Sequence, residues 1–423
     1  MTTMQEEEKS LPRLLPPLGE AKAPEGLREH IARFGRAPEP RDLVALAEES
    51  GLTGRGGAAF PVYRKLAAVT EGNRRPVVIA NGAETEPVSD KDATLLWLAP
   101  HLVLDGLQMV AHAVHANRVI LYVHAHRRGD VGVALTRAIT ERSRGLDAVG
   151  VEIVEAPPRF LAGQETALIN HLGGGPAVPT FPVPRITERG LAGAPTLVQN
   201  AETLAHLALI ARYGARWFRA VGTRTEPGSM LCTVRQADGK PKVIEVPLGI
   251  PLRDLTGTGH SAVLVGGYHG TWIPAEQAKG LTLDNRSLAK LDARVGAGII
   301  VSLPENRCGL AETARVVRYL ALESAGQCGP CLNGLPRIAT AMAELAGPRP
   351  RRKTREDIER WCGLVTGRGA CHHPDGTARL VRSALVTFAA ELDKHARGTC
   401  SATSRDRFLP VPSGAPAREE DWT

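Results

Sequence analysis

The chain has 423 residues, of which 43% are hydrophobic and 23% charged, and its formal net charge is +7. The length allows two or three domains, and the composition is that of an ordinary globular protein. With only five Tyr and seven Phe and no interleaving of basic and aromatic residues, nucleic-acid binding is not expected. Seven cysteines, an odd number, and no secretory signal argue against a disulfide framework and favour the cytoplasm. No stretch reaches the ~20 apolar residues that a membrane helix needs.

The first half of the chain has the pattern of an arm followed by an α/β domain. Residues 1–40 are rich in Pro, Glu and Lys, which favours an extended arm. A short helix is expected at Pro40–Glu49, followed by a glycine-rich loop, Gly51–Phe60. The next predicted strands are Pro76–Ala80, Arg118–His124 and Val151–Glu155, and the predicted helices are His101–Ala116, Gly132–Arg142 and Gln164–Leu172. Strands that alternate with helices predict a parallel sheet covered on both faces.

The pattern changes near Gly222. Short β-like runs then predict a small mixed β domain, at Ser229–Val234, Val243–Val246, Ser261–Val265 and Gly298–Ser302. From Pro304 the periodicity is helical, with candidate helices at Leu310–Ala325, Leu335–Leu345, Thr354–Leu364 and Thr377–Lys394. The polar, Pro-containing tail from Gly398 is expected to be loose. The predicted division is therefore 1–40, 41–222, 223–303, 304–397 and 398–423.

A glycine-rich loop is the first candidate binding site. Gly54, Gly56 and Gly57 remove side-chain bulk, so backbone N–H groups can turn toward a phosphate or a flat ring. Arg55 and Lys65 would add positive charge near an anionic cofactor. A flexible connecting loop is the alternative interpretation, since the stretch is not the G-x-G-x-x-G fingerprint.

Three further loops lie where open α/β sheets bind ligands. The loop Asn81–Pro87 directly follows a predicted strand, so Asn81 is placed to bond a flavin ring edge and a carboxylate to accept from ribose hydroxyls. The alternative is a solvated acidic turn. Gly163–Thr166 and Gln199–Thr203 are similar, and ordinary polar capping of helix N-termini is their alternative.

The cysteines form a candidate metal site. Cys328 and Cys331 have C-x2-C spacing, Cys371 follows forty residues later, and Cys362 lies nine residues before Cys371. Thiolates at this spacing can hold one metal ion or one edge of a cluster. The alternatives are inert buried cysteines, or a redox dithiol, which normally opens a helix rather than following one.

Together and in this order, these motifs resemble the flavin-binding NADH dehydrogenase subunit of respiratory complex I. Diaphorase subunits of NAD-linked hydrogenases and formate dehydrogenases share the pattern. The similarity runs from about Gly51 to His395. The matching segments are GLTGRGGAAFP, NGAETEP, AGQETALINHL with PTLVQNAETLAHL, and ESAGQCGPCLNG with GRGAC.

The resemblance implies an α/β protein: an FMN-binding α/β domain, a small β-grasp (ubiquitin-like) domain, and a C-terminal four-helix iron–sulfur domain. It implies FMN, a [4Fe–4S] cluster and NAD(H), with NADP(H) left open. FMN accepts hydride from NADH and passes single electrons through the cluster to a ferredoxin or partner subunit. No catalytic side chain is expected, because hydride passes between cofactors.

The resemblance also implies which residues of the quoted motifs contact FMN and the dinucleotide. The implied FMN contacts are Gly54, Arg55, Gly56, Gly57, Asn81, Gly163 and Asn200. The implied dinucleotide contacts are Phe60, Lys65, Glu86 and Glu165, and the same loops add Glu84, Gln164 and Gln199 as cofactor-binding candidates.

The cluster region departs from the family pattern. Ala325 stands where the first cysteine belongs, which leaves three expected ligands. Cys362 is the preferred fourth ligand, and His372 or His373 is the substitute. Cys308 is disfavoured as a ligand, because a predicted helix of roughly sixteen residues separates it from Cys328 by more than ~20 Å. A flavin-only diaphorase and a zinc-binding structural or assembly protein remain alternative functions.

Two further features concern substrate and partner. Ala83 and Gln164 replace family acids, which weakens discrimination against the 2′-phosphate of NADPH, but Glu86 and Glu165 favour NADH. The basic run Arg349–Arg355 is a candidate docking site for an acidic ferredoxin, with a solvated loop as the alternative. An association with a membrane-bound partner is left open.

Overall fold

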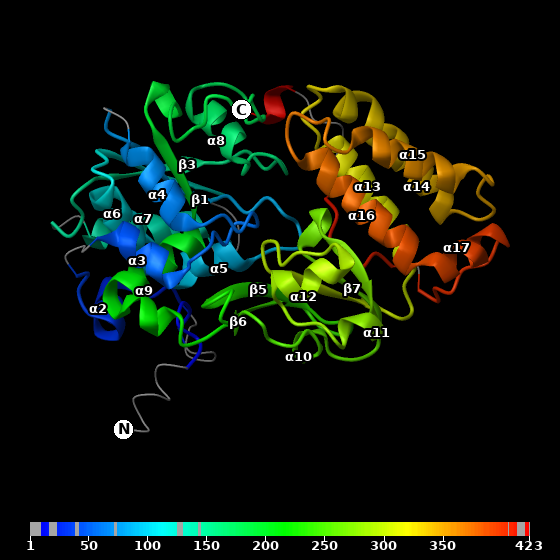
Figure 1. The fold of residues 1–423 in the computed structure, drawn as a ribbon, viewed down its shortest axis with the longest axis horizontal. Helices are drawn as coiled ribbons and strands as arrows, with labels where there is room; N and C mark the ends of the chain where they lie inside the picture. Colours follow the sequence, from blue (N-terminus) through cyan, green and yellow to red (C-terminus); the bar gives the residue numbers. More distant parts are fainter. Residues whose placement is uncertain are drawn as a thin grey trace.

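The computed structural model describes residues 10–16, 23–38, 42–71, 74–124, 130–142, 145–404, 406–412 and 419–422. Within them, a parallel sheet with its helices, a mixed sheet and a group of helices follow one another along the chain (Figure 1). The protein is therefore of the mixed α/β class.

The parallel sheet has the strand order β3-β2-β1-β4. Its strands are β1 (Val77–Gly82), β2 (Arg118–Val123), β3 (Val151–Glu155) and β4 (Thr196–Asn200). The predictions for β1 to β3 are confirmed, whereas β4 was not predicted because only Thr-Leu-Val precedes its polar end. The chain adds β2 and β3 on one side of β1 and then returns to place β4 on the other side. The gap between β1 and β4 is thus a topological switch point.

Helices cover both faces of this sheet, as predicted. Val78 and Leu121 face one core, whereas Ile79 and Tyr122 face another, which is the two-residue alternation of strands. The first face is covered by α3 (Leu43–Ser50), α4 (Val62–Thr70), α5 (Lys91–Leu98), α6 (Pro100–Ala113), α7 (Val131–Arg142) and α9 (Ala201–Phe218). On the second face lies α8 (Glu165–Leu172).

The pair α5 and α6 turns sharply at Ala99 and Pro100. Pro100 begins α6, where its missing N–H is tolerated, and the two helices are bent by 95°. No single helix in the described part of the chain is long and apolar enough to cross a membrane; this bent pair passes that test only when its members are taken together. At the other end of α5, its first turn lies near the end of β1, since Lys91 and Asp92 line the same cavity as Asn81.

The mixed sheet has the order β6-β5-β9-β7-β8, in which only β5 and β9 pair in parallel. Its elements are β5 (Ser229–Arg235), β6 (Lys242–Pro247), α10 (Arg253–Thr256), β7 (His260–Val265), β8 (Thr271–Pro274), α11 (Ala275–Ala278), α12 (Asn285–Leu288) and β9 (Ile299–Pro304). Four of these strands were predicted. The fifth, β8, is four residues long and has too little pattern to be recognised.

The helical region contains one helix more than predicted. It comprises α13 (Gly309–Leu322), α14 (Leu335–Ala346), α15 (Thr354–Val365), α16 (His373–Thr387) and α17 (Ala389–Ala396). The single helix predicted over Thr377–Lys394 is wrong: the chain leaves helical geometry at Phe388, with φ −106° and ψ 28°. The break places the Phe388 ring 5.3 Å from that of Trp272, so a tertiary contact replaces helix continuity.

Both ends of the chain pack more closely than their composition predicts. In the predicted arm, Leu14 and Leu15 are buried and α2 (Leu27–Phe34) is a helix. In the predicted loose tail, Phe408 and Leu409 are buried, and their backbone N–H groups donate to Glu312 at 3.0 and 2.9 Å. The expectations of an extended arm and a loose tail are therefore wrong for the described residues, because isolated apolar residues find sites on distant elements.

Candidate cofactor site and cysteine cluster

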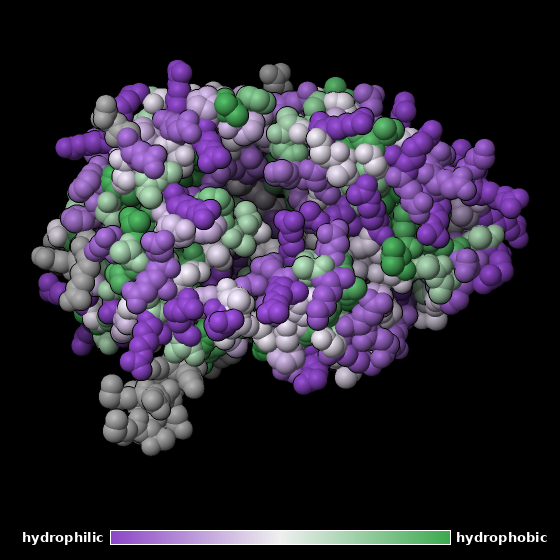
Figure 2. Space-filling model, in the orientation of Figure 1, coloured by the Kyte–Doolittle hydropathy of each residue, from purple (hydrophilic) through white to green (hydrophobic). Residues whose placement is uncertain are grey.

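A cavity of about 320 Å³ opens at the switch point. Asn81 at the end of β1 and Asn200 at the end of β4 are register partners on its floor. The opposite wall carries Cys371, His372 and His373 from the helical region. Figure 2 shows the surface hollowed between the parallel-sheet region and the helices. The predicted site residues that line the cavity are Gly56, Asn81, Glu84, Glu86, Gly163, Gln164, Asn200 and Cys371.

Glycines let the binding loops approach one another. A Cβ on Gly163 would lie 3.0 Å from the carbonyl oxygen of Ala83, and one on Gly56 would lie 3.3 Å from the Cβ of Asn200. The Asn81 side chain joins the same loops, because its Nδ2 donates to the carbonyl of Gly163 at 2.9 Å. The loops therefore form a cradle of backbone with little side-chain bulk.

Two polar residues cap helices at the cavity wall. The Gln164 side-chain oxygen accepts from the backbone N–H groups of Thr166 and Ala167 at the start of α8. Asn200 accepts from the N–H of Glu202 at 3.0 Å and donates to Asp92 at 2.8 Å. The capping interpretation of both motifs is confirmed, and both residues also line the cavity. The positive ends of α8 and α9 consequently lie at the cavity wall.

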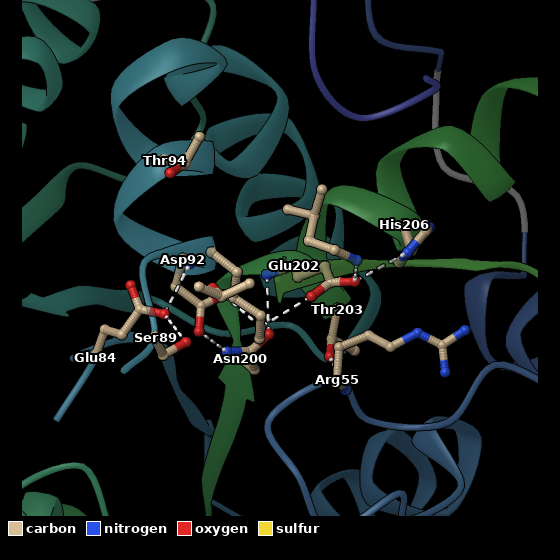
Figure 3. Close-up of polar contacts among 12 residues, drawn as sticks. Arg55, Glu84, Ser89, Asp92, Thr94, Asn200, Glu202, Thr203 and His206 are labelled. Atoms are coloured by element: carbon tan, nitrogen blue, oxygen red, sulfur yellow. Dashed lines mark hydrogen bonds and ion pairs between the residues drawn. The ribbon is translucent and has the colours of Figure 1, made fainter. Parts of the chain in front are cut away.

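A buried charge network, which sequence reasoning missed, lies beside Asn200 (Figure 3). The Lys91 ammonium contacts Asp92 and Glu202, each at 2.8 Å. Glu84 accepts from the N–H groups of Asp92 and Ala93 at the first turn of α5. In the sequence, Ser89–Asp92 has the composition of a solvated turn, and no local signal marks Lys91 as buried. Glu84 thus serves a helix rather than offering a free carboxylate to a ribose.

The pKa values in this network show how its charges are held. Burial acts to lower the pKa of Lys91, but the Asp92 and Glu202 carboxylates outweigh it and raise that pKa. Burial raises the pKa of Asp92 to about 6, against the opposing effect of Lys91. Burial would also raise the pKa of Glu202, yet Lys91 and His206 lower it to about 2. Lys91 therefore keeps its positive charge in the cavity wall.

Arg55 corrects one expectation. Its guanidinium points away from the cavity (Figure 3) and donates to the carbonyls of Ser229 and Pro227 at 3.2 and 3.3 Å. The side chain is 4% exposed. Its charge is engaged by backbone carbonyls at the start of the mixed sheet, so Arg55 joins two regions of the protein and does not face an anionic ligand.

The remaining predicted contacts lie outside the cavity lining. Lys65 forms an ion pair with Glu165, and Phe60 is 43% exposed on the glycine-rich loop. Gln199 is buried, and its Nε2 has no hydrogen-bond partner among the residues that the structure describes. The other two predicted glycines, Gly54 and Gly57, belong to the loop but not to the lining, and Gly57 has a φ of +110° that favours glycine.

Three of the predicted cysteines come together beside the cavity. Cys328 precedes a π-helical turn (Pro330–Gly334) that contains Cys331, and Cys371 lies two residues before α16. Burial and the neighbouring Cys328 and Cys371 thiols raise the pKa of Cys331 to about 12. The Cys331 thiol therefore lies close to both Cys328 and Cys371.

The preferred fourth ligand belongs to the third helix of the helical region. Cys362 is fully buried in the apolar core of α15, and the charged groups that act on its thiol are Arg382 and Glu359. His373 has both ring nitrogens engaged, with His269 at 3.0 Å and with the carbonyl of Leu320 at 2.8 Å. Neither expectation is supported, because tertiary packing directs both side chains into the protein core.

His372 is placed differently. Its side chain is fully exposed, lines the cavity next to Cys371, and lies 3.3 Å from Asp375 through Nδ1. Of the three substitutes predicted from the sequence, it is the one whose side chain projects away from the apolar core.

Comparisons with known proteins match two segments of the chain that contribute residues to this cavity. Residues 47–209 match the Nuo51 FMN-binding domain, and residues 311–395 match the NADH-ubiquinone oxidoreductase-F iron-sulfur binding region. The chain is 30% identical to an F subunit of NADH-quinone oxidoreductase from Rhizobium meliloti over 379 residues, covering 84% of this chain and 89% of the relative. The chain belongs to the family of NADH-quinone oxidoreductase F subunits.

Another F subunit and one solved structure are similar to this chain to a comparable degree. The F subunit of NADH-quinone oxidoreductase from Streptomyces coelicolor is 28% identical, with 88% of this chain and 86% of that protein covered. A crystal structure of an NAD⁺-reducing [NiFe]-hydrogenase in the H₂-reduced state aligns with a TM-score of 0.75 and 29% identity. That alignment covers 84% of this chain, and this chain spans 62% of the hydrogenase chain.

Proposed function

We propose that this member of the F subunit family is an NADH-oxidising electron-input module that holds FMN and an iron–sulfur cluster. The observation that carries the proposal is that one cavity has the flavin-type loops on one wall and Cys371 on the other. A hydride acceptor bound there would lie close to the cysteines that receive its electrons. When bound, FMN takes two electrons as hydride and releases them one at a time.

The residues of the cavity fit FMN. Gly56 and Gly163 let the binding loops approach closely, since a Cβ at either would press on a neighbouring loop, and Asn81 and Asn200 line the cavity from adjacent strands. Lys91 supplies a buried positive charge to the same wall. The flat ring of FMN packs well against backbone that carries little side-chain bulk. Its phosphate is stabilised by positive charge and by helix N-termini. These residues would bind and orient the flavin.

Cys328, Cys331 and Cys371 are the proposed cluster ligands, with His372 as the fourth in place of Cys362. Imidazole ligates some iron–sulfur clusters, and the exposed His372 ring adjoins Cys371. A His372→Ala variant should lose iron when purified anaerobically, whereas Cys362→Ser should keep it. Equal iron content in wild type and His372→Ala would exclude His372.

A single set of variants tests the main proposal. Gly163→Val should reduce bound FMN and NADH:ferricyanide activity by at least about tenfold, because its side chain would press on the Ala83 carbonyl and displace the loop after β1. Gly239→Val is the matched control, since a Cβ there would lie 3.8 Å from its nearest neighbour. Cys328→Ser should keep FMN and ferricyanide reduction but lose iron and electron transfer to a protein acceptor. Full-chain protein that binds no FMN on reconstitution would contradict the proposal.

The flavin-only diaphorase remains a second candidate, and Ala325 is the observation that favours it. If the wild-type chain contains FMN and reduces ferricyanide but binds no iron after anaerobic reconstitution, this second function replaces the first. The zinc-binding alternative lacks similar support, because residues 311–395 match an iron-sulfur binding region.

We also propose NADH rather than NADPH as the substrate. Glu86 lines the cavity and accepts from the backbone N–H of Tyr268 at 2.9 Å, which orients its carboxylate. Such a carboxylate accepts from a ribose hydroxyl and repels a 2′-phosphate. Glu86→Gln should lower the kcat/KM ratio of NADH over NADPH by roughly tenfold. An unchanged ratio would place discrimination elsewhere.

The finer domain division is likewise a proposal: 41–222 for FMN and dinucleotide, 223–303 as the β-grasp domain, and 304–397 as the cluster domain with α13 to α16 as its four helices. The five-stranded mixed sheet with short helices between its strands supports the middle assignment. Limited proteolysis of the full chain should cut first near the two boundaries. Early cleavage within β5 or α13 would contradict this division.

A ferredoxin or another electron-transfer subunit is the proposed acceptor, in a cytoplasmic location consistent with seven unpaired cysteines. Exposed Leu332 lies in the π-helical turn that holds Cys331, and Val365, next to exposed Leu364, faces Gly334 of that turn. The basic run lies at the opposite end of α14, whose twelve residues span ~18 Å. The run would therefore steer an acidic partner from a distance rather than contact it at the electron exit.

This arrangement predicts different salt dependences. Leu332→Glu should slow ferredoxin reduction at every ionic strength, whereas Arg352→Glu combined with Lys353→Glu should slow it only at low salt. Neither change should affect NADH:ferricyanide activity. Ferredoxin reduction that is unchanged at low salt in the double variant would exclude the steering role.

A further inference from the structure

A second group of metal-ligating side chains lies apart from the proposed cluster. Cys308, Glu391, His395 and Cys400 place one ligand atom each within 4.8 Å of all the others. They come from three segments: the N-cap of α13, one face of α17, and the chain just beyond α17. Nothing in the proposed electron path uses them.

The hydrogen bond of His395 shows how its ring is oriented toward this group. Its Nδ1 lies 3.1 Å from the carbonyl oxygen of Leu345, which can only accept, so Nδ1 carries the hydrogen. In the neutral ring, Nε2 then presents its lone pair to the group, 3.6 Å from the Cys308 sulfur and 3.4 Å from a Glu391 oxygen. Metal-binding histidines are oriented in this way, with the second ring nitrogen donating to a carbonyl or carboxylate.

The other ligands are also held by backbone and side-chain donors. The N–H of Ala311 donates to the Cys308 sulfur at 3.4 Å, and the N–H of Ala402 donates to Cys400 at 3.4 Å. The Glu391 carboxylate accepts from the N–H and the hydroxyl of Ser401, at 2.7 and 2.5 Å. Each ligand thus has an outer contact that fixes its direction.

We propose that these four side chains form a structural zinc site. At tetrahedral angles, zinc bonds of ~2.3 Å to sulfur and ~2.0 Å to nitrogen or oxygen separate the ligand atoms by about 3.3–3.8 Å, which lies within the 4.8 Å limit that these four atoms meet. Two thiolates, one carboxylate and one imidazole complete four coordination, so no position is left for a substrate. The thiol protons are released on binding, and Lys394, 3.9 Å from Glu391, offsets the remaining negative charge.

The site fastens the C-terminal segment to the helical region. Cys400 begins the stretch that continues to Phe408, and Thr403 and Ser404 donate to the carbonyl of Asn306 at 3.2 Å. Zinc would join this stretch to the first turn of α13 and to α17. It would therefore raise the free energy of unfolding without touching the cavity.

Metal analysis of the full chain tests the site. Wild-type protein purified anaerobically, incubated with zinc chloride and desalted should retain one zinc per chain. Cys400→Ser should lower zinc at least roughly tenfold and abolish the rise in Tm that zinc causes in wild type. Cys400 is exposed, so its substitution leaves the core intact. Cys328→Ser should lose iron and keep zinc, and Cys232→Ala, at a buried cysteine in β5, should keep both.

Three results would overturn the proposal. They are a wild-type chain that retains no zinc, equal zinc in wild type and Cys400→Ser, and a Cys308–Cys400 disulfide found by mass spectrometry in protein isolated under reducing conditions. None of them depends on FMN content or NADH oxidation, so the zinc site and the proposed function fail or survive separately.

Discussion

Asn81 and Asn200 occupy matching positions on neighbouring strands, and the side chain of each joins separate segments. Asn81 ties the loop of Gly163 to the end of β1, while Asn200 caps α9 and bonds Asp92. Because both side chains are already engaged, they are held in fixed positions at the cavity. Such preorganisation lowers the ordering cost of cofactor binding.

Lys91 is the residue on which we expect the cavity wall to depend most. It is 1% exposed between Asp92 and Glu202, so Lys91→Met would leave two buried carboxylates without a counter-charge. We expect a loss of about 3–5 kcal/mol in the free energy of unfolding, together with weaker FMN binding. Urea unfolding of the FMN-free protein measures the first effect. The exposed Lys290→Met should change stability by under about 0.5 kcal/mol, and equal losses in both variants would contradict this role.

Elements far apart in the chain are joined by a second buried ion cluster, around Asp105 on α6. His30 on α2 lies 2.8 Å from Asp105, and Arg142 on α7 also lies 2.8 Å from it. Arg212 on α9 completes the cluster. Three helices thus meet one carboxylate, which explains how the arm predicted to be extended is held against the α/β region.

This cluster gives the docking of α2 a pH dependence. Burial would lower the pKa of His30, but Asp105 and Glu25 outweigh it and raise that pKa, while His101 lies nearby. Because the pKa of His30 is higher in the folded than in the unfolded protein, its protonation stabilises the fold. This stabilisation is complete below the unfolded pKa of ~6.5 and is lost as the pH rises through the folded pKa. His30→Gln should therefore destabilise by about 1 kcal/mol more near pH 5.5 than near pH 8.5. Urea unfolding at both pH values measures this, and a pH-independent difference would exclude the charged imidazole.

On the scale of the whole molecule, the C-terminal segment connects regions that the sequence separates. Arg235 on β5 donates to the carbonyl of Phe408 at 2.6 Å, and Tyr268 donates to that of Pro410 at 2.6 Å. The backbone N–H of Ala177 donates to the carbonyl of Trp422 at 2.6 Å. The segment therefore crosses from the helices to the mixed sheet and on to the loop after α8.

Phe408 should be the main apolar contact of that segment. It is 7% exposed, and the guanidinium of Arg235 lies 4.0 Å above its ring. Phe408→Ala should lower the free energy of unfolding by about 3 kcal/mol, with a matching fall in Tm. Leu146→Ala, at a side chain 42% exposed, serves as the control and should cost under about 0.5 kcal/mol. A Phe408→Ala variant as stable as the control would show that the segment contributes little.

The sequence by itself determined the features that depend on neighbours within a few residues. Apolar runs predicted β1, β2 and β3, helical periodicity predicted α13 to α15, and the ordered loops identified the family and its cofactors. Asn81 and Gly163 could be selected because they lie in loops that follow strands of the predicted parallel sheet, where open α/β sheets bind ligands. The replacement of a family cysteine by Ala325 was likewise evident from the sequence alone.

Tertiary structure decided what depends on distant parts of the chain. Lys91 meets Glu202 across 111 positions, and Arg55 meets Ser229 across 174, so no local pattern could show that one faces the cavity and the other leaves it. The same holds for Cys362, which packs into the core, and for Cys308, which the fold brings to His395 and Cys400. Tertiary packing decides where these side chains lie, because the burial of a charge or thiol depends on the elements that cover it and not on its neighbours in sequence.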